Sequence, residues 1–121
     1  MKTKKVAIIG AFASPVGRYA RQKGSRPPIA EQDLLSEVSI AALKQAGIEA
    51  KDVGSAIFTT VSPETRQLGF ATHMAARLGL RCTGQLSQVM EMGITGGLAF
   101  DQAAADIQLG RADLALALGD A

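Results

Sequence analysis

The chain has 121 residues, of which 47% are hydrophobic and 20% are charged. This composition is typical of one globular domain of modest core and argues against intrinsic disorder. The formal net charge of +2 is too small to indicate nucleic-acid binding. No apolar run approaches the roughly 18 residues that span a bilayer, and the run after Lys5 is too short for a signal peptide. We therefore expect a cytoplasmic protein without a membrane span.

Positive charge is concentrated at the N-terminal end. Residues 1–30 carry seven Lys and Arg side chains and no acidic residue. The rest of the chain carries six basic and eleven acidic residues. The basic segment could meet a phosphate-bearing ligand or an acidic partner, or it could be a solvated loop, and the sequence leaves these alternatives open.

The first elements in chain order are a strand, a loop and a helix. The near-continuous apolar run Val6–Phe12 predicts a strand that is buried on both faces. Residues 13–30 are rich in Gly, Pro, Ser and Arg and predict a long loop. Asp33 is the expected N-cap of a helix over Leu34–Ala46, and Gly47 is its expected end.

The remaining elements continue the alternation of strands and helices. The β-branched and aromatic residues of 53–61 predict a second strand, which a turn at 62–65 connects to a helix over 66–78. The predicted third strand, third helix and fourth strand are Gly84–Met92, Gly96–Leu109 and Ala112–Leu118. The order β-α-β-α-β-α-β predicts an α/β fold with a mostly parallel sheet and helices on its faces.

The third predicted helix is unusual because it has little side-chain bulk. Such a helix lets other backbone approach closely, so we expect it to be buried at the centre of a layered protein. Its polar residues would then need partners or solvent; they are Asp101, Gln102, Asp106 and Gln108. The chain stops directly after a predicted buried strand. We therefore expect residues 1–121 to be one domain of a longer protein, or a half that needs a partner.

Two conventional kinds of site have little support in the sequence. Cys82 is the single cysteine and His73 the single histidine, so neither a disulfide nor a Cys/His metal cluster is predicted. We interpret them as a partly buried thiol and a surface imidazole, not as a catalytic pair. A nicotinamide-binding alternative rests on the strand that ends at Gly10. The next glycine is Gly17, however, and the Gly-x-Gly-x-x-Gly pattern is absent.

The glycine-rich stretch 93–97 predicts a tight corner between a strand and a helix. The first N–H groups of a helix have no partner within the helix, and they carry partial positive charge. The N–H groups of Ile94, Thr95 and Gly96 could therefore point at an oxyanion or a thioester carbonyl. The alternative is that the glycines serve only backbone geometry. The spacing alone does not decide between these interpretations.

Several segments, in their order and spacing, resemble the motifs of one protein family. Val6–Gly10 followed by Ser14–Tyr19 resembles its first strand and its T-P-F-G-R-F loop. Leu34–Gly47 with Asp52-Val53 resembles its first helix and the lead into strand two. Gly110–Gly119 resembles its G-x-A-D turn and the strand that ends in its glycine pair. Nearly the whole chain thus resembles the N-terminal half of the thiolase superfamily, nearest to the sterol-carrier or lipid-transfer type.

The resemblance implies one half of the five-layered thiolase fold, with the nucleophile in a Cys-x-Ser-Gly motif at the start of the buried helix. The matching residues are Gly93, Ile94, Thr95 and Gly96, so glycine occupies the cysteine position. A Claisen thiolase needs a thiolate there to accept the acyl group, and glycine cannot supply one. The other catalytic residues of the family lie in its C-terminal half and have no counterpart here.

The resemblance thus implies a thiolase-like acyl-CoA enzyme of lipid or sterol side-chain metabolism, in an acyltransferase superfamily, without Cys-dependent chemistry. Retro-aldol cleavage is the implied route, with residues 93–96 binding the substrate. Coenzyme A thioester is the substrate, and no other cofactor or metal is expected. The resemblance also implies a homodimer through Gln85–Met92. An accessory protein subunit could be a further partner. The alternative is a non-catalytic scaffold subunit that binds acyl-CoA or a partner protein.

Overall fold

Three parallel strands form the sheet in the described part of the chain. The computed structural model describes residues 3–15, 30–60 and 69–119. β1 (Ser55–Thr59) is the central strand, and it pairs with β2 (Leu86–Val89) on one side and β3 (Ala115–Gly119) on the other. All five residues of β1 are buried. The predicted α/β class with a parallel sheet is confirmed. The predicted turn at 62–65 and the start of the second helix lie outside the described residues.

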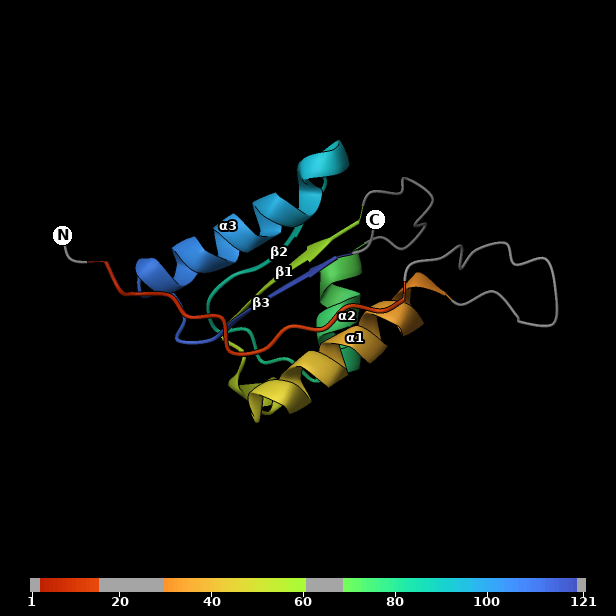
Figure 1. Ribbon diagram of the computed structural model, residues 1–121, viewed down its shortest axis with the longest axis horizontal. Helices are drawn as coiled ribbons and strands as arrows, with labels where there is room; N and C mark the ends of the chain where they lie inside the picture. Colours follow the sequence, from red (N-terminus) through yellow and green to blue (C-terminus); the bar gives the residue numbers. More distant parts are fainter. Residues whose placement is uncertain (1–2, 16–29, 61–68, 120–121) are drawn as a thin grey trace, which may run out of the picture.

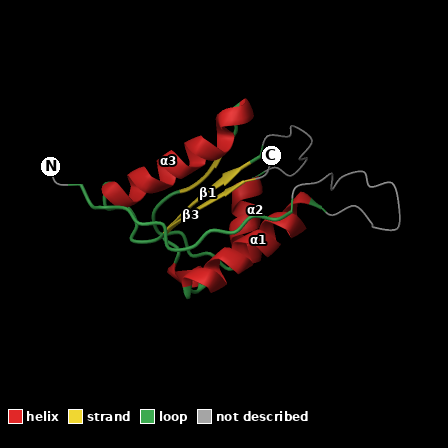
Figure 2. Ribbon diagram, in the orientation of Figure 1, coloured by secondary structure: helices red, strands yellow, loops and turns green. Residues whose placement is uncertain are grey.

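The helices form a layer on each face of the sheet (Figures 1 and 2). α1 (Glu31–Ala46) and α2 (Phe70–Leu78) cover one face, and α3 (Thr95–Gln108) covers the other. Short 3₁₀ segments lie at Ala50–Asp52, before β1, and at Met92–Ile94, before α3. Among the described residues, no helix combines the length and hydropathy that a bilayer span requires.

The core is divided between the two faces of the sheet. On the side of α1 and α2 it contains large side chains, and the rings of Phe58 and Phe70 meet edge to face with centroids 6.4 Å apart. On the side of α3 it is built from Ile57 with Ala99 and Ala103. Ala99 and Ala103 of this helix therefore pack against the sheet, whereas Gly96 and Gly97 at its start are exposed.

The helices end where the sequence predicts, but α1 begins elsewhere. Gly47, Gly79 and Gly110 have φ angles of 70°, 74° and 75°, which is the left-handed region that favours glycine. The prediction of Asp33 as the N-cap is wrong, because α1 starts at Glu31 after the extended residue Ala30. The carboxylate of Asp33 pairs instead with Arg77 of α2.

The prediction of a strand over Val6–Phe12 is also wrong. Residues 3–15 contain no strand, and the apolar run lies largely exposed along the outer side of β3 (Figure 1). At one end of the run, the backbone N–H of Lys4 donates a hydrogen bond to the carbonyl oxygen of Gln108, at the end of α3, with a distance of 3.4 Å. The N–H of Ala11 ties the other end to α1, at 2.7 Å from Oε1 of Gln45. An apolar run fits a strand locally, but pairing needs a backbone ladder that these contacts do not provide.

Two other glycines are required by close packing between strands. A Cβ on Gly84 would lie 2.5 Å from Oγ of Ser55 and 2.8 Å from the Arg111 carbonyl oxygen. A Cβ on Gly119 would collide with the side chain of Thr59. The hydroxyl of Thr59 donates a hydrogen bond to the carbonyl oxygen of Leu118 at 3.2 Å, so it fills the space beside β3.

Candidate active site

The strand-to-helix corner between β2 and α3 is the candidate site. β2 ends at Val89, which is paired with Thr59 of β1. The 3₁₀ turn Met92–Ile94 follows, and α3 begins at Thr95. Figure 1 shows that this end of α3 lies at the same end of the molecule as the carboxyl ends of β1 and β3. Open parallel sheets commonly bind ligands at the carboxyl ends of their strands.

The corner is closed by two hydrogen bonds. The N–H of Ile94 donates to the carbonyl oxygen of Glu91 at 3.2 Å. The N–H of Glu91 donates to Oγ1 of Thr95 at 2.8 Å. Thr95 is only 1% exposed, so its hydroxyl group belongs to the internal structure of the corner. This position supplies a brace between the two elements, not an accessible nucleophile.

The glycines of the corner are not explained by backbone geometry or by packing among the described residues. Gly93, Gly96 and Gly97 are exposed, and none of them has a positive φ angle. A Cβ on any of them would have no described heavy atom within 4 Å. Gly96 and Gly97 lie in the first turn of α3, where neither close packing nor a positive φ angle among the described residues requires glycine. The corner is therefore open to a ligand or to another backbone.

The four predicted binding residues do adjoin one another at this corner, but they differ in accessibility. Gly93, Ile94 and Gly96 are exposed, and Ile94 is 62% exposed. Thr95 is buried between them. The exposed residues present their backbone and the apolar side chain of Ile94 to a ligand. The N–H of Ile94 already donates to the Glu91 carbonyl oxygen, so Gly93 and Gly96 are the exposed glycine positions that a ligand could approach.

Cys82 and His73 do not form a catalytic pair in the structure. The thiol of Cys82 is partly buried, and burial raises its pKa, an effect that a backbone hydrogen bond partly offsets. His73 is exposed on α2. The described part of the chain contains no hydrogen bond between these two side chains. Burial disfavours the thiolate form of Cys82, which makes this thiol a weak nucleophile.

Gly10 is used for packing against α1. A Cβ on Gly10 would lie 2.8 Å from the carbonyl oxygen of Ala42 and 3.1 Å from Cβ of Ala46. This close approach explains the glycine without a phosphate ligand. The nicotinamide alternative therefore loses one of the residues that suggested it.

A buried polar network under α3 was only partly foreseen from the sequence. Asp106 is fully buried and accepts a hydrogen bond from Nη1 of Arg111 at 3.1 Å. In the amide orientation that satisfies its neighbours, Gln85 donates to both carboxylate oxygens of Asp106 at 3.1 Å. Gln102 donates to Oγ of Ser87 in β2 at 3.2 Å. The network attaches α3 to β2. In the sequence, only the polar residues of the predicted third helix indicated it.

The fold is that of a thiolase-like domain. The profile of the family described as thiolase, N-terminal domain, matches residues 6–120. The chain therefore belongs to the thiolase N-terminal domain family. Comparison with curated protein sequences gave no significant match.

Solved structures share the fold at low sequence identity. The acetyl-CoA acetyltransferase from Syntrophomonas wolfei is 21% identical, with a TM-score of 0.78 over 90% of this chain and 27% of that chain. The 3-oxoacyl-(acyl carrier protein) synthase III from Xanthomonas oryzae is 21% identical, with a TM-score of 0.61 over 69% and 25% of the two chains. OleA from Xanthomonas campestris, solved with lauric acid and lauroyl-CoA, is 24% identical, with a TM-score of 0.62 over 70% and 26%. This chain thus spans about a quarter of the length of these relatives.

Proposed function

We propose that this chain forms part of a thiolase-like enzyme that acts on an acyl-CoA thioester without a cysteine nucleophile. The proposal rests on the resemblance that aligns Gly93 with the cysteine position of the family motif, and the observation that supports it is the open, exposed corner around Gly93. A thiolate at that position would accept the acyl group in thiolysis or Claisen condensation. Cys82 does not match the motif, and its burial disfavours the thiolate.

The reaction that fits these groups is retro-aldol cleavage of a β-hydroxyacyl-CoA. A base removes the proton of the β-hydroxyl group, and the bond between the α and β carbons breaks. The electron pair of that bond passes to the thioester as an enolate, which is then protonated. The products are a carbonyl compound and a shortened acyl-CoA. The exposed backbone of Gly93 and Gly96 would stabilise the enolate oxygen, because the N–H of Ile94 already donates to Glu91 and Thr95 is buried. This role needs no covalent bond to the enzyme.

The substrate class follows from the same proposal. The sterol-carrier or lipid-transfer branch, which the sequence resembles most, points to a fatty-acyl or sterol side-chain thioester. The bound lauroyl-CoA of the OleA structure supports a thioester of this kind. Coenzyme A is then part of the substrate, and a homodimer formed through Gln85–Met92, with an accessory subunit as a further partner, belongs to the proposal.

The test compares two reactions of the protein that carries this domain. Acetoacetyl-CoA with free coenzyme A measures thiolysis, and a β-hydroxyacyl-CoA with a side chain at the β carbon measures cleavage to a carbonyl compound. We expect cleavage without thiolysis. Rapid thiolysis by the unchanged protein would overturn the assignment of Gly93. The variant Gly93→Cys, compared with Gly93→Ser, shows whether a thiol at this corner is sufficient to restore acyl transfer.

A non-catalytic scaffold is the second candidate, and the exposed apolar surface favours it. Ile94, Leu98 and Phe100 of the corner and of α3 are 62%, 36% and 53% exposed, as a surface that contacts another protein would be. A scaffold would bind acyl-CoA or a partner protein without turnover. Retained binding together with no gain of acyl transfer in Gly93→Cys would favour it over the enzyme.

A further inference from the structure

Glu91 is the one ionisable residue of the segment that forms the candidate corner. From Leu86, the first residue of β2, to Phe100, in the second turn of α3, the sequence contains no other acidic, basic, histidine, cysteine or tyrosine residue. The retro-aldol reaction described above needs a base, because the β-hydroxyl group must lose its proton as the carbon chain breaks. Within this segment, the carboxylate of Glu91 is the only group that can take that proton.

The backbone of Glu91 is held by the corner itself. Its N–H donates to Oγ1 of Thr95 at 2.8 Å, and its carbonyl oxygen accepts from the N–H of Ile94 at 3.2 Å. The first bond ends on a residue that is only 1% exposed, so it is shielded from water. The two bonds fix Glu91 at the start of the turn, two residues before Gly93 and its exposed backbone. A base must be positioned in this way, because its reach depends first on geometry.

The carboxylate of Glu91, in contrast, is not engaged by its neighbours. Glu91 is exposed, and in the part of the chain that the structure describes, its side chain takes part in no hydrogen bond and no ion pair. The carboxylates of Asp33 and Asp106 each pair with an arginine. A carboxylate without such a partner can take a proton from a ligand without breaking an ion pair. Glu91 therefore combines a fixed backbone with an unengaged side chain.

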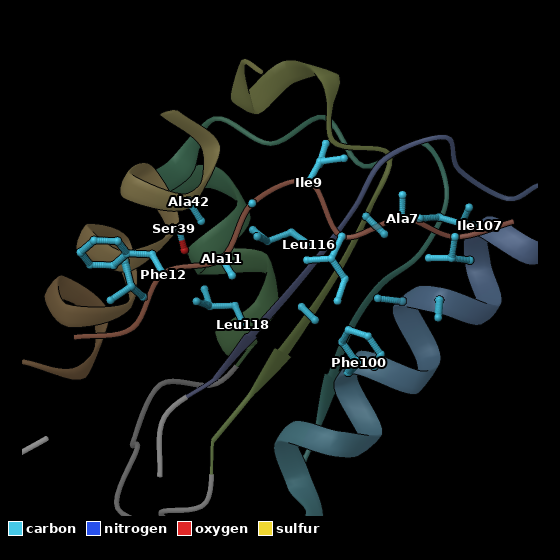
Figure 3. A pocket seen from close by; sticks show the side chains of 18 residues that line it. Ala7, Ile9, Ala11, Phe12, Ser39, Ala42, Phe100, Ile107, Leu116 and Leu118 are labelled. Carbon is cyan, nitrogen blue, oxygen red and sulfur yellow. The ribbon is translucent and has the colours of Figure 1, made fainter. Parts of the chain in front are cut away.

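Other described groups do not offer the same chemistry to the corner. Asp101 is exposed on α3, but it lies five residues beyond Gly96, about 7.5 Å further along the helix axis. An apolar cavity of about 320 Å³ lies at the opposite edge of the sheet, between β3 and residues 6–12 (Figure 3). None of its lining residues is ionisable, and Ser39 is the polar side chain that Figure 3 labels there. This cavity therefore has no group that can move a proton.

The proposed dimer does not take Glu91 away from the corner. The segment Gln85–Met92 includes Glu91, but the N–H of Glu91 is already bonded to Thr95. β2 itself ends at Val89. A backbone ladder between two β2 edges would therefore stop before Glu91, and its backbone would stay in the corner.

We propose that Glu91 is the acid–base catalytic residue of this corner, an inference that rests on the proposed retro-aldol function. Its carboxylate takes the proton of the β-hydroxyl group, and the electron pair of the O–H bond becomes the second bond of the leaving carbonyl group. The bond between the α and β carbons breaks, and its electron pair passes to the thioester as an enolate. Protonated Glu91 then returns the proton to the α carbon. One proton is taken and one is returned, so no further reactant is needed.

A single carboxylate can serve both steps because of the structure of the substrate. The hydroxyl oxygen and the α carbon are both bonded to the β carbon, so they lie on the same part of the molecule. The α carbon is also bonded to the thioester carbon, whose oxygen would lie at the exposed backbone of Gly93 and Gly96. A substrate held there places its reacting atoms beside the turn that begins at Glu91.

Matched variants test this role in the protein that carries the domain. Glu91→Gln keeps the size of the side chain and the backbone hydrogen bonds of the corner, but it removes the base. With a β-hydroxyacyl-CoA, kcat for cleavage should fall about 10²- to 10⁴-fold, while KM changes little. Asp101→Asn removes an exposed carboxylate away from the corner and should keep the rate of the unchanged protein. In Glu91→Ala, added formate should restore part of the rate, because it can enter the space of the missing carboxylate.

Proton exchange at the α carbon gives a readout that does not need cleavage. Acetyl-CoA is the shortened product of a β-hydroxyacyl-CoA without an α substituent, so it is used alone in deuterated water. In the reverse of the second step, Glu91 removes a proton from the α carbon and returns a deuteron. Mass spectrometry should show deuterium uptake with the unchanged protein and with Asp101→Asn. With Glu91→Gln, uptake should be at least about 100-fold slower.

The outcomes distinguish this inference from the proposed function. Equal cleavage by Glu91→Gln and the unchanged protein would overturn the role of Glu91 and keep the retro-aldol reaction. Exchange that depends on Glu91, without cleavage of the β-hydroxyacyl-CoA, would support Glu91 as the base and overturn the retro-aldol reaction. Loss of acetyl-CoA binding in Glu91→Gln, measured by calorimetry, would make Glu91 a binding residue and overturn its acid–base role. Neither exchange nor cleavage by the unchanged protein would overturn both.

Discussion

The hydroxyl oxygen of Thr95 accepts a hydrogen bond from the backbone N–H of Glu91 at 2.8 Å, across the turn that joins β2 to α3. This bond makes the corner one braced unit. Thr95→Val removes the acceptor and keeps the shape, so we expect the free energy of unfolding to fall by about 1–2 kcal/mol. Thr95→Ser keeps the acceptor, so its free energy of unfolding should fall by less. Urea denaturation measures both, and equal losses would contradict the role of the hydroxyl group.

The corner glycines should tolerate side chains that a packed glycine does not. Gly93→Ala should change the free energy of unfolding by no more than about 0.5 kcal/mol, because the new Cβ meets open space. Gly84→Ala places the same group against Ser55 and the backbone of Arg111, and should cost about 1–3 kcal/mol. The two urea midpoints give the comparison. A large loss in Gly93→Ala would mean that glycine at this position serves the fold.

The buried carboxylate of Asp106 should be important for the attachment of α3. Asp106→Ala removes the acceptor of Gln85 and Arg111, and we expect a loss of about 2–3 kcal/mol in unfolding free energy. The Arg111 side chain is 57% exposed and can turn to solvent, which limits the loss. Asp101→Ala, on the exposed face of the same helix, is the control and should change stability little. Similar effects of the two variants would argue against the network.

The thiol of Cys82 should react slowly at neutral pH. Burial raises its pKa, so the protonated form is the one that the folded state favours. The preference of the folded state for the protonated thiol contributes to stability. This contribution is present below the ordinary thiol pKa of about 8.5 and is lost as the pH rises through the higher pKa of the folded state. The rate of iodoacetamide reaction against pH should have its inflection above that of the unfolded chain. Cys82→Ala should lose less stability than the unchanged protein as the solution becomes alkaline.

Self-association of the 121-residue chain is expected from its surface. Large hydrophobic residues are exposed on the N-terminal run and on α3; they include Ile8 at 70%, Phe12 at 53% and Phe100 at 53%. Contiguous apolar surface of this kind promotes association. Sedimentation velocity should show species that grow with protein concentration. A strictly monomeric chain that unfolds cooperatively would contradict this prediction.

Local signals in the sequence predicted most of the elements. Gly47, Gly79 and Gly110 mark helix ends because a left-handed residue is a local requirement. Tertiary contacts decided the rest. Asp33 has the chemistry of an N-cap but pairs with Arg77 across two helices. The apolar run at 6–12 fits a strand, yet the partner of a strand is a distant segment that periodicity does not identify.

The location of the candidate site could be predicted from the glycine-rich stretch, but its internal structure could not. Nothing in the sequence indicates that the hydroxyl group of Thr95 turns inward to the N–H of Glu91. The open space around Gly93 could not be predicted either, because the sequence does not distinguish a glycine that the backbone geometry requires from a glycine beside empty space. Only the placement of neighbouring atoms distinguishes Gly93 from Gly84.

The contact between Thr59 and Gly119 links two positions that are far apart in the chain. Any side chain at 119 would occupy the space that the hydroxyl group of Thr59 fills. Homologous sequences should therefore vary at these positions as a pair. A residue larger than glycine at 119 is compatible with the sheet only where position 59 has become smaller, so Gly119→Ala should be rescued by Thr59→Gly although neither substitution is favourable alone.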